Sequence, residues 1–296
     1  MQQREITTYQ KVFLDIRRQF WRAGYPGADL EARELICAAS GKSREEFYRD
    51  RALYLSPETE DAVRALARRH LDGEPVAYLI GEWEFYGLTL EVTPAVLIPR
   101  VDTEVLAEAA IRFAGTLKKC RLLDLCTGSG CVGLAAAANV SGCRALLGDV
   151  SQEALTVCRR NVRRCGLMDR VKAEALDALA PPPEAIGLFD CITCNPPYIT
   201  RAEMEALDRS VKDFEPHLAL CGGEDGLDFY RAAAKNWKNA LTEKGRLYFE
   251  VGAGQAGQVR RLMAGEGFAD INILPDTQGI GRVVYGTRNH EKEAVV

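Results

Sequence analysis

The sequence contains no long apolar run and nothing that resembles a signal peptide. No hydrophobic stretch approaches the roughly 20 residues that span a bilayer, and residues 1–9 lack the apolar core of a secretion signal. Low-complexity segments and repeats of fixed period are also absent. We therefore expect a globular cytoplasmic protein without a membrane partner.

Histidine is scarce, and no metal-ligand spacing is present. The three histidines, His70, His217 and His290, are scattered. The ten cysteines lie mostly inside apolar runs, which predicts reduced, buried thiols. Cys191 and Cys194 have the spacing of a metal or redox pair, but residues three apart in a strand point to opposite faces. We therefore expect no bound metal.

No region of the chain is strongly basic. The net charge is -4, with 13 basic and 12 acidic residues up to Gly73 and 25 basic and 30 acidic after it. This balance argues against a large electrostatic contact with nucleic acid, and no stable nucleic acid partner is expected. Four arginines cluster at 159, 160, 163 and 164, and we interpret them as a solvated helix face.

The chain length suits two domains. Residues 1–73 have the periodicity of helices throughout, for example at Val12, Ile16 and Phe20. They predict a small helical bundle that either docks a partner or merely packs on the rest. Residues 74–100 predict a β-hairpin linker, because apolar residues alternate around Gly87.

From residue 101 to 296 the pattern changes to alternating strands and helices. Such alternation predicts an α/β fold with a mostly parallel, Rossmann-like sheet covered by helices on both faces. The last strand follows a short link and is expected to be antiparallel. Seven strands are predicted, at 121–125, 145–149, 171–175, 190–194, 246–251, 271–274 and 282–285.

A loop of small residues follows the first of these strands. Asp124, Cys126, Gly128 and Gly130 alternate in it, and small residues let backbone N–H groups approach a ligand. Asp149 ends the next strand, where a carboxylate suits the hydroxyls of a ribose. Together these residues predict a nucleotide-binding site.

Spacing and charge distinguish between two kinds of nucleotide. The third glycine of the dinucleotide motif is missing, and Asp124 would repel a pyrophosphate. An acid there favours a cationic ligand. S-adenosyl-L-methionine carries an ammonium, a sulfonium and a ribose but no phosphate, so we expect this cofactor, with S-adenosyl-L-homocysteine as product.

The segment Asn195-Pro196-Pro197-Tyr198 ends the fourth strand. An amide or amino nitrogen conjugated to a π system is a poor nucleophile, because its lone pair is delocalised. The Asn195 side-chain carbonyl and the Pro196 main-chain carbonyl can hold its two N–H bonds and stabilise charge that develops on methylation. Tyr198 offers a flat face to the planar group. The motif does not choose among adenine N6, guanine N2, cytosine N4 and a glutamine amide.

Several further blocks make the sequence similar to the bacterial peptide chain release factor glutamine methyltransferases over nearly its whole length. Asn-Pro-Pro-Tyr is shared with DNA adenine methyltransferases, whereas the Ile-Pro-Arg and Phe-Glu-Pro blocks are much more specific. The blocks are Glu74-Pro75-Val76-Ala77-Tyr78-Leu79-Ile80-Gly81, Phe85-Tyr86-Gly87, Leu97-Ile98-Pro99-Arg100-Val101-Asp102-Thr103-Glu104, Asp124 to Gly130, Asn195 to Tyr198, and Phe214-Glu215-Pro216-His217-Leu218-Ala219-Leu220.

The resemblance implies methylation of N5 of the glutamine in the Gly-Gly-Gln loop of class one release factors, which the helical domain would help to dock. We expect the protein to be a monomer. It implies catalytic roles for Asn195, Pro196 and Tyr198, with Pro197 completing the substrate site. The cofactor-binding residues expected are Asp124, Cys126, Thr127, Gly128, Ser129, Gly130, Asp149, Val150, Ala175 or Leu176, and Asn195.

Two departures from the family pattern bear on these expectations. Cys126 stands where the family often has glycine, and we expect it not to need a positive φ. Val101 replaces the usual proline, so no role is assigned to Arg100, Asp102 or Glu104. Three alternatives remain: a nucleobase amine as substrate, a ribosomal-protein glutamine as substrate, or a binding module without catalysis.

Overall fold

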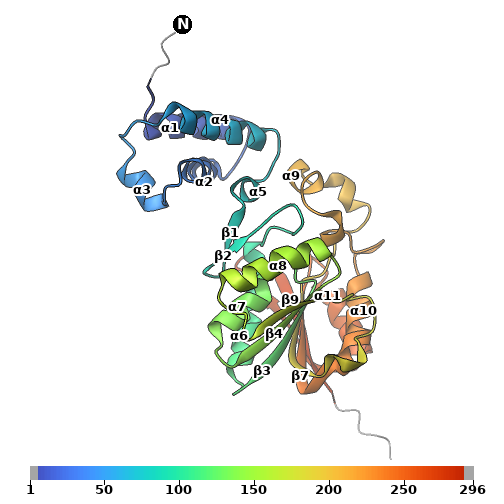
Figure 1. Ribbon diagram of the computed structural model, residues 1–296. Coiled ribbons are helices and arrows are strands. Elements are labelled where there is room, and N and C mark those ends of the chain that lie inside the picture. The colour runs from blue at the N-terminus through green and yellow to red at the C-terminus, as the bar shows by residue number, and fades with distance from the viewer. Residues whose placement is uncertain (1–5, 290–296) are drawn as a thin grey trace, which may run out of the picture. The chain divides into compact units, whose positions relative to one another are not determined.

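Two units make up the chain, Met1–Gly81 and Glu82–Val296. The structure is a computed structural model that describes residues 6–289 (Figure 1). Among the described residues, no helix has the length and apolar character needed to cross a membrane. The division of the chain into a docking domain (1–73), a linker (74–100) and a catalytic domain (101–296) stays a prediction.

The first unit is helical, as predicted. Side chains of Thr8, Ser43 and Ser56 accept hydrogen bonds from the first turns of three helices, which fixes where those helices begin. Val12, Ile16 and Phe20 are fully buried, so the periodic apolar stripe forms the core of this unit. The helices are α1 (Tyr9–Arg22), α2 (Ala28–Ser40), α3 (Arg44–Arg49), α4 (Pro57–Leu71) and α5 (Val76–Ile80).

Helix α5 was not predicted. The sequence predicts a β-hairpin linker from residue 74, without a helix in it. Pro75 is in fact the N-cap of this short helix, and Gly81 ends it with a φ of 79°. Five residues are too few for an apolar period to be recognised.

The predicted hairpin opens the second unit. Strands β1 (Glu82–Phe85) and β2 (Leu88–Glu91) pair antiparallel. Tyr86 and Gly87 between them have φ values of 47° and 77°, and positive φ at both central residues is the type I′ geometry that suits a two-residue hairpin.

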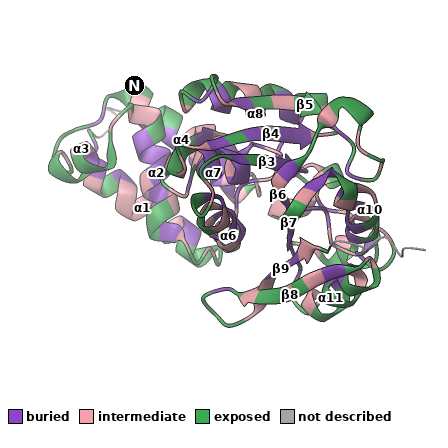
Figure 2. Ribbon diagram, turned by 90° about the horizontal axis from the view of Figure 1, so that it is seen from below, coloured by how far each residue is buried: buried purple, intermediate pink, exposed green. Residues whose placement is uncertain are grey.

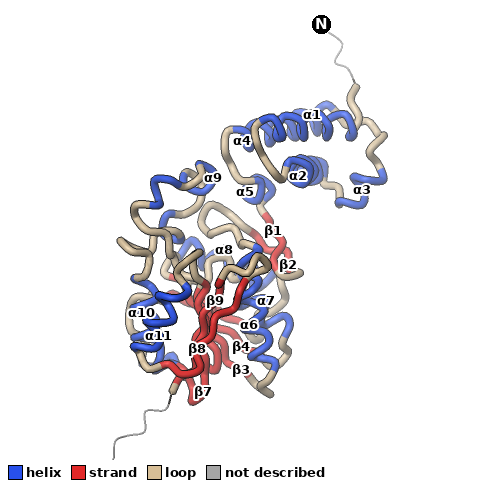
Figure 3. Tube along the Cα trace, turned by 180° about the vertical axis from the view of Figure 1, so that it is seen from behind, coloured by secondary structure: helices blue, strands red, loops and turns tan. Residues whose placement is uncertain are grey.

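The main sheet has the seven strands expected, which confirms the predicted fold class (Figure 3). Its order is β5-β4-β3-β6-β7-β9-β8, and only β9 runs against its neighbours. The strands are β3 (Cys120–Leu125), β4 (Cys143–Asp149), β5 (Val171–Ala175), β6 (Phe189–Cys194), β7 (Leu241–Glu250), β8 (Phe268–Pro275) and β9 (Gly281–Arg288).

Helices pack on both faces of this sheet, and its central strands are buried between them (Figure 2). One face carries α6 (Glu104–Gly115), α7 (Cys131–Asn139) and α8 (Gln152–Arg164), and the other carries α10 (Asp228–Trp237) and α11 (Ala256–Gly265). Cys191 lies in the first core and Cys194 in the second, so the two thiols do point to opposite faces. Within residues 6–289, no group of side chains could hold a metal.

The arginine cluster on α8 is more than a solvated face. Arg160 pairs with Glu91 at 2.8 Å, and Arg164 pairs with Glu82, so both bind the hairpin. The Arg159 guanidinium donates to the carbonyl of Ala173. Three of the four guanidinium groups therefore contact other residues of this chain.

Between β6 and α10 the structure has short elements that were not predicted. They are η3 (Glu203–Ala206), α9 (Arg209–Lys212) and η4 (His217–Ala219). Three further 3₁₀ turns are η1 (Val101–Thr103), η2 (Glu184–Ile186) and η5 (Lys238–Ala240). Elements of three or four residues leave little periodic signal in a sequence.

Candidate active site

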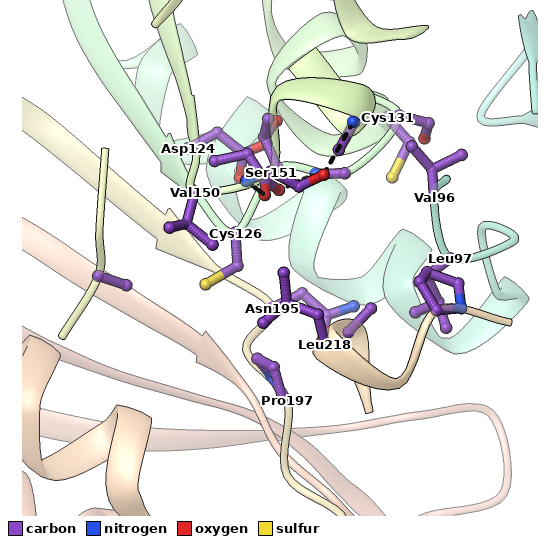
Figure 4. Close-up of a pocket in the computed structure, with 18 of the residues that line it drawn as sticks. Val96, Leu97, Asp124, Cys126, Cys131, Val150, Ser151, Asn195, Pro197 and Leu218 are labelled. Carbon is purple, nitrogen blue, oxygen red and sulfur yellow. Dashed lines mark hydrogen bonds between the residues drawn. The ribbon is translucent and has the colours of Figure 1, made fainter. Parts of the chain in front are cut away.

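A pocket opens in the second unit at the carboxyl ends of β3, β4, β5 and β6. This is the edge where open α/β sheets bind ligands. In Figure 4, Asp124, Cys126, Val150 and Ser151 lie on one side of the pocket, and Val96 and Leu97 face them from the other.

The pocket brings together most of the residues predicted to bind cofactor or substrate. It is lined by Asp124, Cys126, Thr127, Gly128, Ser129, Asp149, Val150, Leu176, Asn195 and Pro197. Four predicted residues are not among its lining: Gly130, Ala175, Pro196 and Tyr198. Gly130 caps α7 with a φ of 88°, and a Cβ there would lie 3.0 Å from the Cys158 sulfur. Its role in the structure is to let the loop turn closely over α8.

Cys126 contradicts the expectation about its backbone. Its φ is 55°, in the left-handed region that residues other than glycine rarely adopt. The loop turns sharply after β3, and a cysteine in the sequence does not by itself indicate a positive φ. The family's frequent glycine at this position was the signal, and Cys126 accepts the same backbone geometry with strain.

Asp124 is almost fully buried at the end of β3. Its carboxylate accepts hydrogen bonds from the hydroxyls of Thr127 at 2.5 Å and Thr193 at 2.7 Å, and from the Gly133 N–H at 3.3 Å. Burial raises the pKa of Asp124 to about 6, while these three hydrogen bonds lower it. Asp124 thus holds the loop to β6 and α7, and it contributes negative charge to one end of the pocket.

Asp149 holds the same loop from the end of β4. Its two carboxylate oxygens accept from the backbone N–H groups of Gly128 at 2.9 Å and Ser151 at 3.0 Å. Burial raises the pKa of Asp149 against these hydrogen bonds. Asp149 lines the pocket, and its two oxygens have more lone pairs than these two hydrogen bonds use, so acceptor capacity remains for ribose hydroxyls.

Asn195 follows β6 and presents its amide to the pocket. The amide nitrogen donates to the Thr103 hydroxyl at 3.3 Å. Thr103 ends η1, is buried, and also lines the pocket. The Asn195 carbonyl oxygen is thereby left as the acceptor on the opposite side of the amide.

Pro196 and Tyr198 belong to the same turn as Asn195 but are not among the residues that line the pocket. Pro196 is buried, and no hydrogen-bond donor to its carbonyl occurs within residues 6–289. The Tyr198 carbonyl accepts from Gln255 Nε2 at 3.0 Å, and its ring packs on Gly252, where a Cβ would lie 3.0 Å from Cδ2. Burial raises the pKa of Tyr198. Whether the Tyr198 ring contacts a substrate stays a prediction.

The two most family-specific blocks meet at the wall of the pocket. The buried carboxylate of Glu215 accepts from the Ile98 N–H at 3.2 Å and pairs with the Arg100 guanidinium. Arg100 and Pro216 both line the pocket. Sequence reasoning assigned no role to Arg100 or Glu215, although the Ile-Pro-Arg and Phe-Glu-Pro blocks that contain them carried the signal.

Glu250, at the end of β7, is another buried carboxyl and interacts with the Asn195 side chain. Burial raises its pKa to about 7, whereas the Thr103 hydroxyl, the Arg282 guanidinium and the Asn195 amide lower it. Its Oε2 has no hydrogen-bond partner among the described residues. The sequence alone left its role open.

The donor set fits S-adenosyl-L-methionine better than a dinucleotide. Asp124 and Asp149 give negative charge to the end of the pocket formed by the loop at residues 126–130. Among the described residues that line the pocket, Arg100 is the only lysine or arginine. A Cβ built on Gly128 meets nothing within 4 Å, so the loop is open toward the pocket. A pyrophosphate would lie against two carboxylates here, whereas an ammonium and ribose hydroxyls would find acceptors.

Two family models match the chain. Residues 12–81 match the PrmC N-terminal domain, and residues 104–216 match Conserved hypothetical protein 95. The fold is similar to that of a crystal structure of the hMettl16 catalytic domain in complex with the MAT2A 3'UTR hairpin 6. The TM-score is 0.54 at 16% identity, covering 70% of this chain and 77% of that one.

Curated relatives match over most of their length. The release factor glutamine methyltransferase of Geobacter sulfurreducens is 38% identical over 95% of this chain and 97% of its own. That of Clostridium acetobutylicum is 40% identical over 72% of this chain and 75% of its own. The predicted resemblance is confirmed, and the chain belongs to the release factor glutamine methyltransferase family.

Proposed function

We propose that the protein transfers a methyl group from S-adenosyl-L-methionine to N5 of the glutamine in the Gly-Gly-Gln motif of class one peptide chain release factors. The main structural support is that Asn195 lines the same pocket as Asp149 and the loop at residues 126–130, called the glycine loop below. Family membership supports glutamine as the acceptor. The cofactor supplies an electrophilic methyl group.

The residues divide the work by position. The Cys126–Gly130 loop, Asp149 and Leu176 would hold the cofactor. The Asn195 and Pro196 carbonyls would accept the two N–H groups of the substrate amide, which favours a tetrahedral nitrogen and stabilises the positive charge that develops on it. No strong base is required before transfer, because the methylated nitrogen is acidic until it loses a proton.

The helical segment 1–73 is proposed to dock the release factor, with 74–100 as the linker to the catalytic domain. A nucleic acid substrate is less well supported, because Arg159, Arg160 and Arg164 contact the protein itself. No observation favours a second function.

The direct test is methyl transfer from labelled S-adenosyl-L-methionine to purified release factor, ribosomal protein and DNA, assayed in parallel. Label is expected in the release factor alone, and it should disappear when the glutamine of Gly-Gly-Gln is replaced by alanine. Label in DNA or ribosomal protein but not in release factor would overturn the proposal.

A variant tests the site. Asn195→Ala is expected to abolish transfer while leaving most cofactor binding, because the amide mainly orients the substrate. An unchanged rate would remove Asn195 from the mechanism.

A further inference from the structure

The amide of Asn195 has two different ends, and only one of them suits the proposed reaction. Its oxygen can accept from the N–H groups of a substrate amide, whereas its NH₂ group would oppose another donor. A 180° flip of this side chain exchanges the two ends with almost no change in shape. Something in the protein must therefore fix its orientation.

Thr103 contacts one end of this amide. Asn195 Nδ2 donates to Thr103 Oγ1 at 3.3 Å, and Thr103 is only 2% exposed. A threonine hydroxyl can donate as well as accept, so this contact alone does not decide the orientation. If the Thr103 proton pointed at Asn195, the flipped amide would be favoured.

Glu250 can accept a hydrogen bond from the Thr103 hydroxyl. A carboxylate is an acceptor only, and Glu250 Oε2 is buried without a hydrogen-bond partner in the described chain. Burial raises the pKa of Glu250, and interactions with the Thr103 hydroxyl and the Asn195 amide lower it. An unpaired buried acceptor is costly, so attracting the Thr103 proton is favourable.

We propose that Thr103 and Glu250 are positioning residues: Glu250 accepts a hydrogen bond from the Thr103 hydroxyl, and Thr103 accepts one from Asn195 Nδ2, so that the Asn195 oxygen faces the substrate amide. This rests on the proposed function of Asn195. The order of donors runs from Asn195 through Thr103 to Glu250.

The proposal has a pH consequence. Glu250 is a carboxylate above about pH 7 and becomes a donor when protonated below it. A protonated Glu250 can donate to Thr103 Oγ1 and turn the Thr103 proton toward Asn195. The other titratable and charged groups that interact with Glu250 or adjoin it are Asp102 beside Thr103, Arg282 of β9, Tyr198 of the substrate turn, Tyr230 of α10 and Cys131 of α7.

The experiment compares Thr103→Val, which keeps the shape without the hydroxyl, with Thr103→Ser, which keeps the hydroxyl. Turnover with release factor is measured with the full chain, together with the dissociation constant of S-adenosyl-L-methionine. We expect Thr103→Val to lower kcat by about tenfold or more, with cofactor affinity within about twofold, and Thr103→Ser to remain within about threefold of wild type. Thr116→Val, at the exposed end of α6, is the control for a lost threonine hydroxyl.

Glu250→Gln gives the second readout. The wild-type kcat is expected to fall as the pH is lowered through about 7, and this fall should be absent in Glu250→Gln. The proposal would be overturned if Thr103→Val had the same kcat as wild type, or if kcat of Glu250→Gln depended on pH in the same way as that of wild type. If Thr103→Val does not fold, the pH profiles of wild type, Thr103→Ser and Glu250→Gln decide it. Wild-type protein that does not label release factor would instead refute the proposed function.

Discussion

Asn161 hydrogen-bonds Ser129 across 32 positions of the chain. Its Nδ2 donates to the Ser129 carbonyl at 2.9 Å and to the Glu91 carbonyl at 3.0 Å, and its Oδ1 accepts from the Glu91 N–H at 2.7 Å. Asn161 is fully buried on α8. One side chain therefore joins strand β2 of the hairpin to the glycine loop, and the hairpin is part of the framework that positions the loop.

Asn161→Asp is expected to weaken cofactor binding. Aspartate keeps the acceptor for Glu91 N–H but turns a second oxygen toward two carbonyls, so their hydrogen bonds are lost. Each unsatisfied buried group costs about 1–3 kcal/mol, and the loop should lose its fixed position. Isothermal titration with S-adenosyl-L-methionine and chemical unfolding would measure the two effects.

Asn139→Asp is the matched control for this change. Asn139 Nδ2 donates within its own helix, to the Ala135 carbonyl at 2.9 Å, and Asn139 is not among the described residues that line the pocket. Its cofactor affinity should equal that of wild type. An equally tight Asn161→Asp protein would show that the hairpin does not support the loop.

Glu215→Ala should damage substrate binding more than cofactor binding. The change leaves the Ile98 N–H and the Arg100 guanidinium without their shared acceptor, at the wall made by residues 97–100 and 216–219. We expect a loss of about 2 kcal/mol in stability, because Glu215 is buried while Arg100 is 40% exposed at its side chain. The KM for release factor should rise, with the cofactor dissociation constant nearly unchanged.

The exposed pair Arg209–Asp213 provides the comparison for Glu215. This pair lies in the same segment, with 3.0 Å between Arg209 Nε and Asp213 Oδ2, and both side chains are exposed to solvent. Asp213→Ala should change stability by less than about 1 kcal/mol, as exposed ion pairs do. A Glu215→Ala protein with wild-type stability and KM would mean that the wall does not depend on this contact.

The elements with a clear period were predictable from the sequence, and so was the sheet edge where Asp124, Asp149 and Asn195 meet. Their positions follow from strand ends, which alternation and proline mark directly. Thr103, Glu215, Glu250 and Asn161 were not assigned roles, because each acts through a partner 32 to 147 positions away along the chain. Such pairings depend on tertiary packing, which a single sequence does not encode as a local pattern.

Cys126 allows a test of backbone strain in the cofactor loop. Cys126→Gly relieves the positive φ but increases the entropy of the unfolded chain, so we expect stability within about 1 kcal/mol of wild type and retained cofactor binding. Cys126→Val places a β-branched residue at a φ of 55° and should lose about 2 kcal/mol and most cofactor affinity. Cys165→Val, at an ordinary φ of -79°, is the control. Equal behaviour of Cys126→Gly and Cys126→Val would contradict the role of the backbone.

Asp124 predicts how stability depends on pH. Its pKa rises from 3.8 to about 6 on folding, so the folded state binds its proton more tightly. Stability should therefore decrease as the pH rises from about 4 to about 6 and stay level above, by about 3 kcal/mol in total for this group. Asp124→Asn lacks this contribution, although it loses one acceptor for Thr127 or Thr193 at every pH.

Chemical unfolding of wild type and Asp124→Asn at pH 4, 5, 6 and 7 measures the difference directly. Relative to wild type, the variant should gain up to about 3 kcal/mol between pH 4 and pH 7. If Asp124→Asn kept a constant offset from wild type over this range, the carboxylate of Asp124 would not be destabilised by its burial. The negative charge at that end of the pocket would then be better solvated than its hydrogen bonds to Thr127, Thr193 and Gly133 indicate.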